Sequence, residues 1–412
     1  EDPRPYCEIL RQWSTFHPEF SFLPRKFKIA ITGSSTDRAA VAIHDIGLRI
    51  IENDDGERGF QVLVGGGLGR TPILAEVIRG FLPKAHLISY CEAILRVYNL
   101  YGNRENKFKA RIKILVKSLG VEEFRRLVDE EWEQIRETSL LLTDEEIARV
   151  QSFFVPPTYD PGAVDDQSYR AQLESAPRFA RWFENNVSEH KVPGYNVVVL
   201  SLKSEKRPPG DITADQLDAV ADLADAHSLG RVRTTHEQNL VFSDVSNADL
   251  YTLWQRLDEL EMATPNIGKL TDLICCPGLD FCALANAGSI SVAKQITERF
   301  ADLDRQYDLG EIKLKMSGCI NSCGHHHVGN IGILGVNKNG EEFYQIMLGG
   351  SAGDDASLGK WLGPALAKHE VTEALENVLQ TYVKHREEGE RLLDVYRRIG
   401  RDPFKEAVYE SH

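Results

Sequence analysis

Four cysteines in two short groups form the most reactive pattern in this chain. Five residues separate Cys276 from Cys282 in CPGLDFC, and three separate Cys319 from Cys323 in CINSC. Thiolates in such clamps can hold an iron-sulfur cluster. Zinc sites commonly space the cysteines of a clamp by two to four residues, so the first gap fits zinc poorly. The spacing favours iron-sulfur ligation. Because Cys275 directly precedes Cys276, either of them could be the first cysteine of the first clamp.

The composition is typical of a large protein from a reducing compartment. The chain has 412 residues, 42% of them hydrophobic, which suits two or three domains. Seven cysteines, an odd number with four of them clustered, fit thiolate chemistry better than a disulfide framework. We expect the remaining three, Cys7, Cys91 and Cys275, to be ordinary buried thiols.

Charge and hydropathy exclude several classes of partner. A net charge of -14 argues against binding to a nucleic-acid backbone. No run of 18 apolar residues predicts a membrane span, and the N-terminal EDPRPYCEIL has neither the basic stretch nor the apolar core of a signal peptide. We therefore expect a cytoplasmic protein that has no membrane or nucleic-acid partner.

The chain repeats itself weakly, in order, over most of its length. GFQVLVGGG ends at Gly67 and its echo EFYQIMLGGS ends at Ser351, 284 residues later. Asp45–Leu48 resembles Asn330–Ile333, and LGVEEFRRLV resembles IGRDPFKEAV. The first copy begins with strand patterns and continues with helical apolar spacing over 88–100 and 107–136. The repeat predicts two related α+β domains.

A smaller unit lies between the two copies. It begins with the strand pattern YNVVVLSL, continues with a helix whose Thr213 and Gln216 have capping-box spacing, and adds the strands GRVRTT and NLVFSD. A helix from about Ser246 to Leu260 completes a β-α-β-β-α order, which is half of a ferredoxin-like arrangement. The prolines and glycine of 156–177 read as a linker. The predicted organisation is a first α+β domain at 1–155, a linker at 156–177, a ferredoxin-like half-domain at 178–264 and a second α+β domain at 265–412.

The cysteines and three further segments resemble the sirohaem-dependent sulfite and nitrite reductases, most of all the sulfite reductase haemoprotein (beta) subunit. These segments are KLTDLICCPGLDFC with KMSGCINSCGHHHVGNIGILG, LPRKFKIAIT, FQVLVGGGLGRTP and RVRTTHEQNL. In that family the large domain is duplicated, and each copy follows a ferredoxin-like half-domain. The repeat and the resemblance together predict a chain that lacks an N-terminal half-domain of roughly 100 residues.

The resemblance implies two cofactors and their ligands. A [4Fe-4S] cluster would be held by Cys276, Cys282, Cys319 and Cys323, because the family spacing selects Cys276 over Cys275. Cys323 would also bridge to the iron of a sirohaem, which couples an electron reservoir to the substrate-binding metal. Asn321 would lie where it can hydrogen-bond the cluster sulfurs, although turn geometry explains it equally well.

Arg25, Lys26 and Lys28 in LPRKFK are the implied anion-binding residues. On a strand, Lys26 and Lys28 would point the same way, into one pocket. Two ammonium groups would bind an oxyanion and supply protons as its S–O or N–O bonds break, while Arg25 would face a sirohaem carboxylate. Apart from the resemblance, a solvated basic edge strand is the simpler interpretation.

Other motifs carry less information. VGGGLGRTP lacks the G-x-G-x-x-G spacing of a dinucleotide site, which argues against a nicotinamide cofactor. Its echo LGGSAG in the second copy indicates a shared feature of the fold, and the resemblance implies that its amides would cradle sirohaem carboxylates. On an extended segment His325, His326 and His327 would point alternately and could not all converge on one metal. RENKFKARIK at 104–113 would be a basic helix face, able to dock an acidic ferredoxin but more often simply solvated. Arg231 and Arg233 would face only a vestigial, pseudo-symmetric site.

The implied function is assimilatory six-electron reduction of sulfite to sulfide, fed by a ferredoxin or a flavoprotein reductase subunit. Reduction of nitrite to ammonia by the same cofactor pair is the alternative. A non-catalytic iron-sulfur electron-transfer protein is the alternative from another class. Without the first half-domain the chain would lack arginines that the family places around the anion, and could fail to retain sirohaem or turn over.

Overall fold

The computed structural model describes residues 1–164 and 167–410 and divides the chain into two compact units. Unit 1 comprises Glu1–Pro156 with Ser351–Leu358, and unit 2 comprises Pro157–Gly350 with Gly359–His412. Across these described residues, every helix is too short or too polar to cross a membrane.

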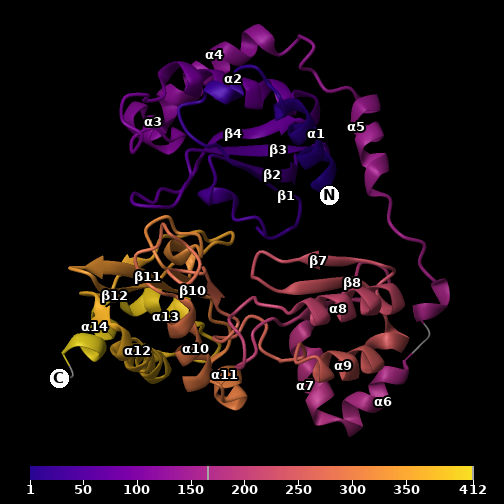
Figure 1. Ribbon diagram of the computed structural model, residues 1–412. Coiled ribbons are helices and arrows are strands. Elements are labelled where there is room, and N and C mark those ends of the chain that lie inside the picture. Colours follow the sequence, from indigo (N-terminus) through magenta and orange to yellow (C-terminus); the bar gives the residue numbers. More distant parts are fainter. Residues whose placement is uncertain (165–166, 411–412) are drawn as a thin grey trace. The chain divides into compact units, whose positions relative to one another are not determined.

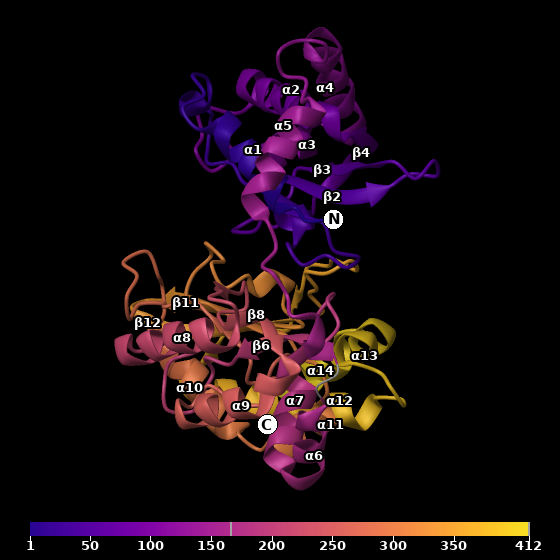
Figure 2. The same cartoon turned by 90° about the vertical axis from the view of Figure 1, so that its right-hand side faces the viewer.

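Unit 1 is a four-stranded sheet with helices packed on it (Figure 1). The sheet runs in the order β1-β2-β3-β4, with β1 parallel to β2 and the other pairs antiparallel. The core contains Phe60 from the sheet, Tyr98 from α2 and Phe124 from α4, all fully buried. Helix α1 lies beside α5 (Figure 2), where Arg149 donates a hydrogen bond to Gln12 at 3.0 Å.

Along the chain, unit 1 begins with one helix, continues with four strands and ends with four helices. They are α1 (Arg4–Ser14), β1 (Ile29–Thr32), β2 (Ile46–Glu52), β3 (Arg58–Val64), β4 (Glu76–Pro83), α2 (Leu87–Tyr101), α3 (Ile112–Leu119), α4 (Val121–Ile135) and α5 (Asp144–Gln151).

Unit 2 begins with a smaller sheet in the order β5-β6-β8-β7, which α8 and α9 cover on one face (Figure 1). The predicted capping box at the start of α8 is confirmed, since Thr213 and Gln216 each bond the other's backbone N–H. The elements are α6 (Ser168–Ser175), α7 (Pro177–Asn186), β5 (Val187–Glu189), β6 (Tyr195–Leu200), α8 (Ala214–His227), β7 (Val232–Thr234), β8 (Leu240–Ser246) and α9 (Leu250–Glu259). The stretch that we predicted as a linker therefore contains α6.

The remainder of unit 2 is a second large sheet with the order β13-β12-β11-β10-β9, and β14 pairs with β12. Strand β10 is parallel to both β9 and β11. The elements are β9 (Ile274–Cys275), α10 (Ile290–Arg299), α11 (Leu303–Leu309), β10 (Leu314–Ser317), β11 (Ile331–Lys338), β12 (Glu341–Leu348), β13 (Lys360–Trp361), β14 (Leu366–Ala367), α12 (Val371–His385), α13 (Leu392–Ile399) and α14 (Asp402–Tyr409).

The predicted duplication is confirmed in three strands of each large sheet and in the helix that follows them. Strands β1 to β3 correspond to β10 to β12 with the same pairing, and α2 begins 284 residues before α12. The correspondence reaches single hydrogen bonds. The backbone N–H of Lys28 donates to the Asp45 carboxylate at 2.9 Å, and that of Lys313 donates to the Asn330 side chain at 2.8 Å.

The helix predicted over 107–136 is wrong at its start and its middle. Gly120 adopts a φ of 86° and breaks the segment into α3 and α4. Residues 104–111 are not helical, because the side chains of Asn103 and Asn106 accept backbone N–H groups two and three residues ahead and stabilise turns. The basic run 104–113 is therefore no continuous helix face.

Candidate functional site

The two cysteine clamps lie at one end of the parallel strands β9 and β10. Cys276 directly follows β9, and Cys319 comes two residues after β10. Because Met316 of β10 is in register with Cys275 of β9, the chain leaves both strands at the same edge. The backbone N–H of Cys276 donates to the carbonyl of Met316 at 3.2 Å. The sheet thus brings together two segments that are more than forty residues apart in sequence.

Cys275 and Cys276 have different surroundings. The Cys276 sulfur accepts the backbone N–H of Gly318 at 3.0 Å and lies 3.7 Å from the Ser289 hydroxyl. The Cys275 thiol is 4% exposed and donates to the carbonyl of Cys276, and burial raises its pKa. A cluster ligand must be a thiolate, which N–H donors stabilise and burial opposes. These contacts suit Cys276 as the ligand and Cys275 as a neutral thiol.

Tight backbone turns present the other cysteines. The N–H of Cys282 donates to the carbonyl of Gly278 at 2.9 Å, and that of Ser322 donates to the carbonyl of Cys319 at 3.2 Å. Ser322 adopts a positive φ of 59° and is buried, whereas Asn321 and Cys323 are exposed. A strained, non-glycine turn between two cysteines is typical of a loop shaped by what it binds.

The three histidines after Cys323 do not lie on an extended segment, and that prediction is wrong. His325 is left-handed with a φ of 57°, and His326–Val328 forms a single 3-10 turn. The rings of His326 and His327 pack 4.0 Å apart, both buried. Burial lowers the pKa of His326 to about 3, so this side chain is neutral.

The arrangement fits an iron-sulfur cluster as a donor set. Four thiols occur in two loops that a shared sheet edge holds together, and one sulfur already receives an N–H bond. Within residues 1–164 and 167–410, no three His, Cys, Asp or Glu side chains are grouped as ligands of a single metal ion. The assignment of Cys276, Cys282, Cys319 and Cys323 as cluster ligands stays a prediction.

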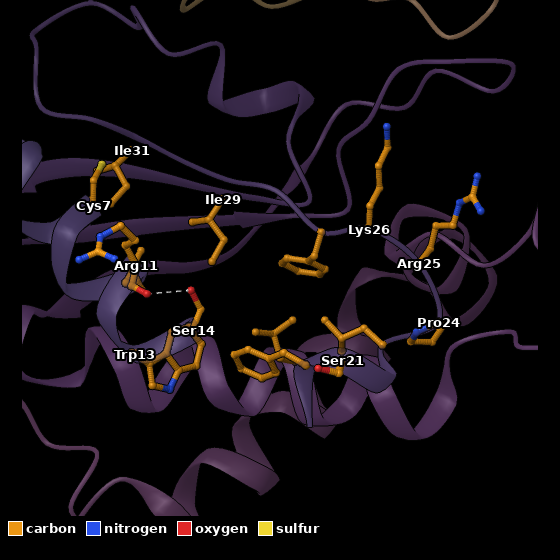
Figure 3. A pocket seen from close by; sticks show the side chains of 15 residues that line it. Cys7, Arg11, Trp13, Ser14, Ser21, Pro24, Arg25, Lys26, Ile29 and Ile31 are labelled. Atoms are coloured by element: carbon orange, nitrogen blue, oxygen red, sulfur yellow. Dashed lines mark hydrogen bonds between the residues drawn. The ribbon is translucent and has the colours of Figure 1, made fainter. Parts of the chain in front are cut away.

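Unit 1 contains a cavity of about 700 Å³ next to the basic segment (Figure 3). Aromatic and aliphatic side chains from α1, the following loop and β1 line much of it. Arg25 and Lys26 also line it, and Figure 3 shows their charged ends turned away from Trp13 and Ser14. Lys28 is not among the lining residues. A shared pocket for Lys26 and Lys28 stays a prediction.

The segment with these lysines precedes the strand, and the prediction that it belongs to the strand is wrong. Strand β1 begins at Ile29, and both lysines are exposed. The N–H of Lys28 bonds to the carboxylate of Asp45 instead of joining a ladder. Asp45 is fully buried and accepts two hydrogen bonds from Arg111 at 2.7 Å. This ion pair fixes the backbone from which Lys28 projects.

The glycine loop after β3 is held from inside by one lysine. The Lys113 ammonium is almost fully buried and donates to the carbonyls of Gly67, Leu68 and Thr71 at 3.3, 2.7 and 2.6 Å. Three carbonyls directed at one cation define the course of this loop. Sequence reasoning missed Lys113, which lies 46 residues after Gly67.

In the second copy, the lysine before the corresponding strand β10 is held in an ion pair. Lys313, the counterpart of Lys28, forms an ion pair with Glu237 at 2.8 Å. In the half-domain, Arg231 precedes β7 and is half-buried, and Arg233 is exposed on β7. Cys7, which we expected to be buried, is exposed on α1, because the sheet core lies under the opposite face of that helix. Cys91 is buried as expected.

Two family models match most of the chain. The model "Nitrite and sulphite reductase 4Fe-4S domain" matches residues 1–136 and 268–412, and "Nitrite/Sulfite reductase ferredoxin-like half domain" matches 205–260. The two stretches of the first model are the two copies of the repeat.

Known relatives include reductases for both anions. Over 413 residues, 97% of this chain, it is 28% identical to "Sulfite reductase [ferredoxin] 2" of Mycolicibacterium paratuberculosis, of whose length it covers 66%. It is 29% identical to "Ferredoxin--nitrite reductase" of Synechococcus elongatus, covering 88% of this chain and 64% of the relative. The solved structure of the Mycobacterium tuberculosis NirA protein superposes with a TM-score of 0.74 at 28% identity, covering 97% of this chain and 68% of that one. The chain thus spans slightly less than two thirds of its curated relatives' length.

Proposed function

We propose that this chain, which belongs to the nitrite and sulfite reductase family, reduces sulfite to sulfide in an assimilatory six-electron reaction. The family membership implies sirohaem and a [4Fe-4S] cluster as cofactors. The observation that carries the proposal is the convergence of the two cysteine clamps at the end of β9 and β10, with an N–H donor on the Cys276 sulfur. Reduction of nitrite to ammonia by the same cofactor pair is the alternative.

In this proposal, one set of residues binds the cluster and another binds the anion. Cys276, Cys282, Cys319 and Cys323 would hold the cluster, and Cys323 would also ligate the sirohaem iron. When bound, these cofactors supply single electrons and an open iron site for the anion. Lys26 and Lys28 would hold the oxyanion electrostatically and donate protons as its oxygen atoms leave. Arg25 would pair with a sirohaem carboxylate, and Asn321 would hydrogen-bond the cluster.

The electron donor in this proposal is a small acidic ferredoxin, with a flavoprotein subunit as the other candidate. Several relatives are named for ferredoxin, including "Sulfite reductase [ferredoxin] 2". The seven cysteines are thiols that are not joined in disulfides, which suits the cytoplasm, where thiols stay reduced.

Substrate preference is tested on the chain reconstituted with sirohaem, iron and sulfide under anaerobic conditions. With reduced methyl viologen as donor, we expect sulfide to form from sulfite with a higher kcat/KM than ammonia from nitrite. Preference for nitrite would replace the proposal with its alternative. A cluster spectrum without sirohaem bands would favour the alternative of a non-catalytic iron-sulfur electron-transfer protein.

A further inference from the structure

The turn between β7 and β8 reaches out of its own sheet to both strands that lead to the cysteines. This turn, Thr235–Asn239, lies in RVRTTHEQNL, a segment for which the proposed function has no use. Glu237 pairs with Lys313 at the start of β10, at 2.8 Å. Gln238 contacts β9 directly. We propose that Gln238 is a positioning residue that holds Cys276 in place for the cluster, an inference that rests on the proposed function.

Gln238 binds the backbone of Cys275 as a neighbouring strand would. Its side-chain oxygen accepts the N–H of Cys275 at 2.9 Å, and its side-chain nitrogen donates to the carbonyl of Cys275, also at 2.9 Å. Strand β9 has only two residues and pairs with β10 on one side. The amide of Gln238 therefore occupies the open side of a very short strand, one residue before Cys276.

The backbone of Gln238 is strained, and its surroundings are shaped for it. Its φ is 59°, a left-handed conformation that a glutamine rarely adopts. Facing it, Gly210 has no side chain, and a Cβ there would lie 2.9 Å from the Cβ of Gln238. Such strain persists only where the surrounding structure imposes it, and it is concentrated at functional sites.

Buried polar contacts anchor the turn on both sides of Gln238. The ammonium of Lys203 donates to the carbonyl of Glu237 at 2.6 Å and to the carboxylate of Asp272 at 3.1 Å. Asn239 donates to the same Asp272 oxygen at 2.9 Å. Lys203 and Asp272 are each 1% exposed in their side chains. These contacts join the half-domain to the segment before β9, so Gln238 can act on Cys275 from a rigid base.

The two hydrogen bonds of Gln238 act one residue away from the sulfur that would hold the cluster. Cys276 follows the clamped residue, and its sulfur accepts the N–H of Gly318 from the adjacent chain segment at 3.0 Å. N–H bonds to cluster sulfurs raise the reduction potential. If Gln238 fixes β9, then its loss lengthens or breaks the N–H bond to the Cys276 sulfur. The half-domain would then tune the cluster without touching it.

The variant Gln238→Gly tests the positioning role without preventing the chain from folding. Glycine adopts a positive φ freely, so this variant loses the clamp while relieving the backbone strain, and it should fold. Leu229→Gly is the matched control, because Leu229 also has a positive φ, 51°, and is 43% exposed in the same half-domain. Gln238→Glu keeps the shape and the acceptor but places a carboxylate oxygen against the Cys275 carbonyl.

The first readout is hydrogen exchange at the Cys275 amide in the cofactor-free chain. We expect it to be about fivefold faster in Gln238→Gly, as for the loss of one net hydrogen bond, and unchanged in Leu229→Gly. The second is the midpoint potential of the cluster in the reconstituted chain, which should fall in Gln238→Gly and Gln238→Glu but not in the control.

Unchanged protection of the Cys275 amide in Gln238→Gly would overturn the inference. The inference would also be overturned if exchange at the Cys275 amide is faster in Gln238→Gly but the midpoint potential of its cluster equals that of the parent. The hydrogen bonds of Gln238 would then serve only the packing of the half-domain. If the parent chain assembles no cluster at all, it is the proposed function that fails, and the exchange measurement still decides whether Gln238 holds β9.

Discussion

Cys276→Ala should abolish cluster assembly, while Cys275→Ala should leave it intact. The two residues are neighbours, yet only the Cys276 sulfur accepts an N–H bond, and burial raises the pKa of the Cys275 thiol. A chain with one ligand missing should lose most of the about four irons of a cubane cluster. Iron and acid-labile sulfide, measured per chain after anaerobic reconstitution, check the result.

The Cys275→Ala variant is a matched control for this prediction. It removes one sulfur from the last residue of β9, next to Cys276, and leaves the backbone bonds to Gln238 available. Full iron content in Cys276→Ala, with loss in Cys275→Ala, would show that the cluster uses the other register.

Lys28→Met and Lys26→Met should each lower kcat/KM for the anion by about 10²–10⁴-fold, the usual loss when a proton donor or an electrostatic stabiliser is removed from an active site. Methionine keeps the length and apolar stem of lysine without its charge. The backbone N–H of Lys28 bonds to Asp45, and Arg111 pairs with Asp45; both contacts remain when an ammonium group is removed, so both variants should fold. Steady-state kinetics on the reconstituted chain measure the effect.

Lys117→Met is the control, since Lys117 is an exposed lysine of α3 outside the basic segment. We expect its kcat/KM to equal that of the parent. If the three variants lose activity equally, or if none of them does, Lys26 and Lys28 have no special role with the anion.

The sequence predicted the parts of the fold that depend on local patterns and on repetition. Thr213 and Gln216 have capping-box spacing and form that box. The echo of Asp45–Leu48 in Asn330–Ile333 correctly indicated two copies, because the same side-chain to backbone bond recurs in each. Such features lie within a few residues of one another or repeat visibly.

What the sequence could not predict depends on contacts between distant segments. Strand β1 begins after Lys28 because the side chain of Asp45, seventeen residues later, takes the Lys28 N–H. Gln238 was missed because glutamine has no preference for a positive φ, and its partner Cys275 lies 37 residues away. His326–Val328 forms a turn where we expected an extended segment, because His325 adopts the left-handed conformation. Three consecutive histidines give no indication of that conformation in the sequence.

The central claim is that the two cysteine clamps hold the cluster of a sirohaem reductase. Metal, sulfide and haem analysis of the anaerobically reconstituted chain tests it most directly. The account predicts about four acid-labile sulfides and about four cluster irons per chain, as a cubane cluster requires, with one further iron for each sirohaem that the chain retains. Iron without sulfide, or stoichiometric zinc in place of iron, would contradict it.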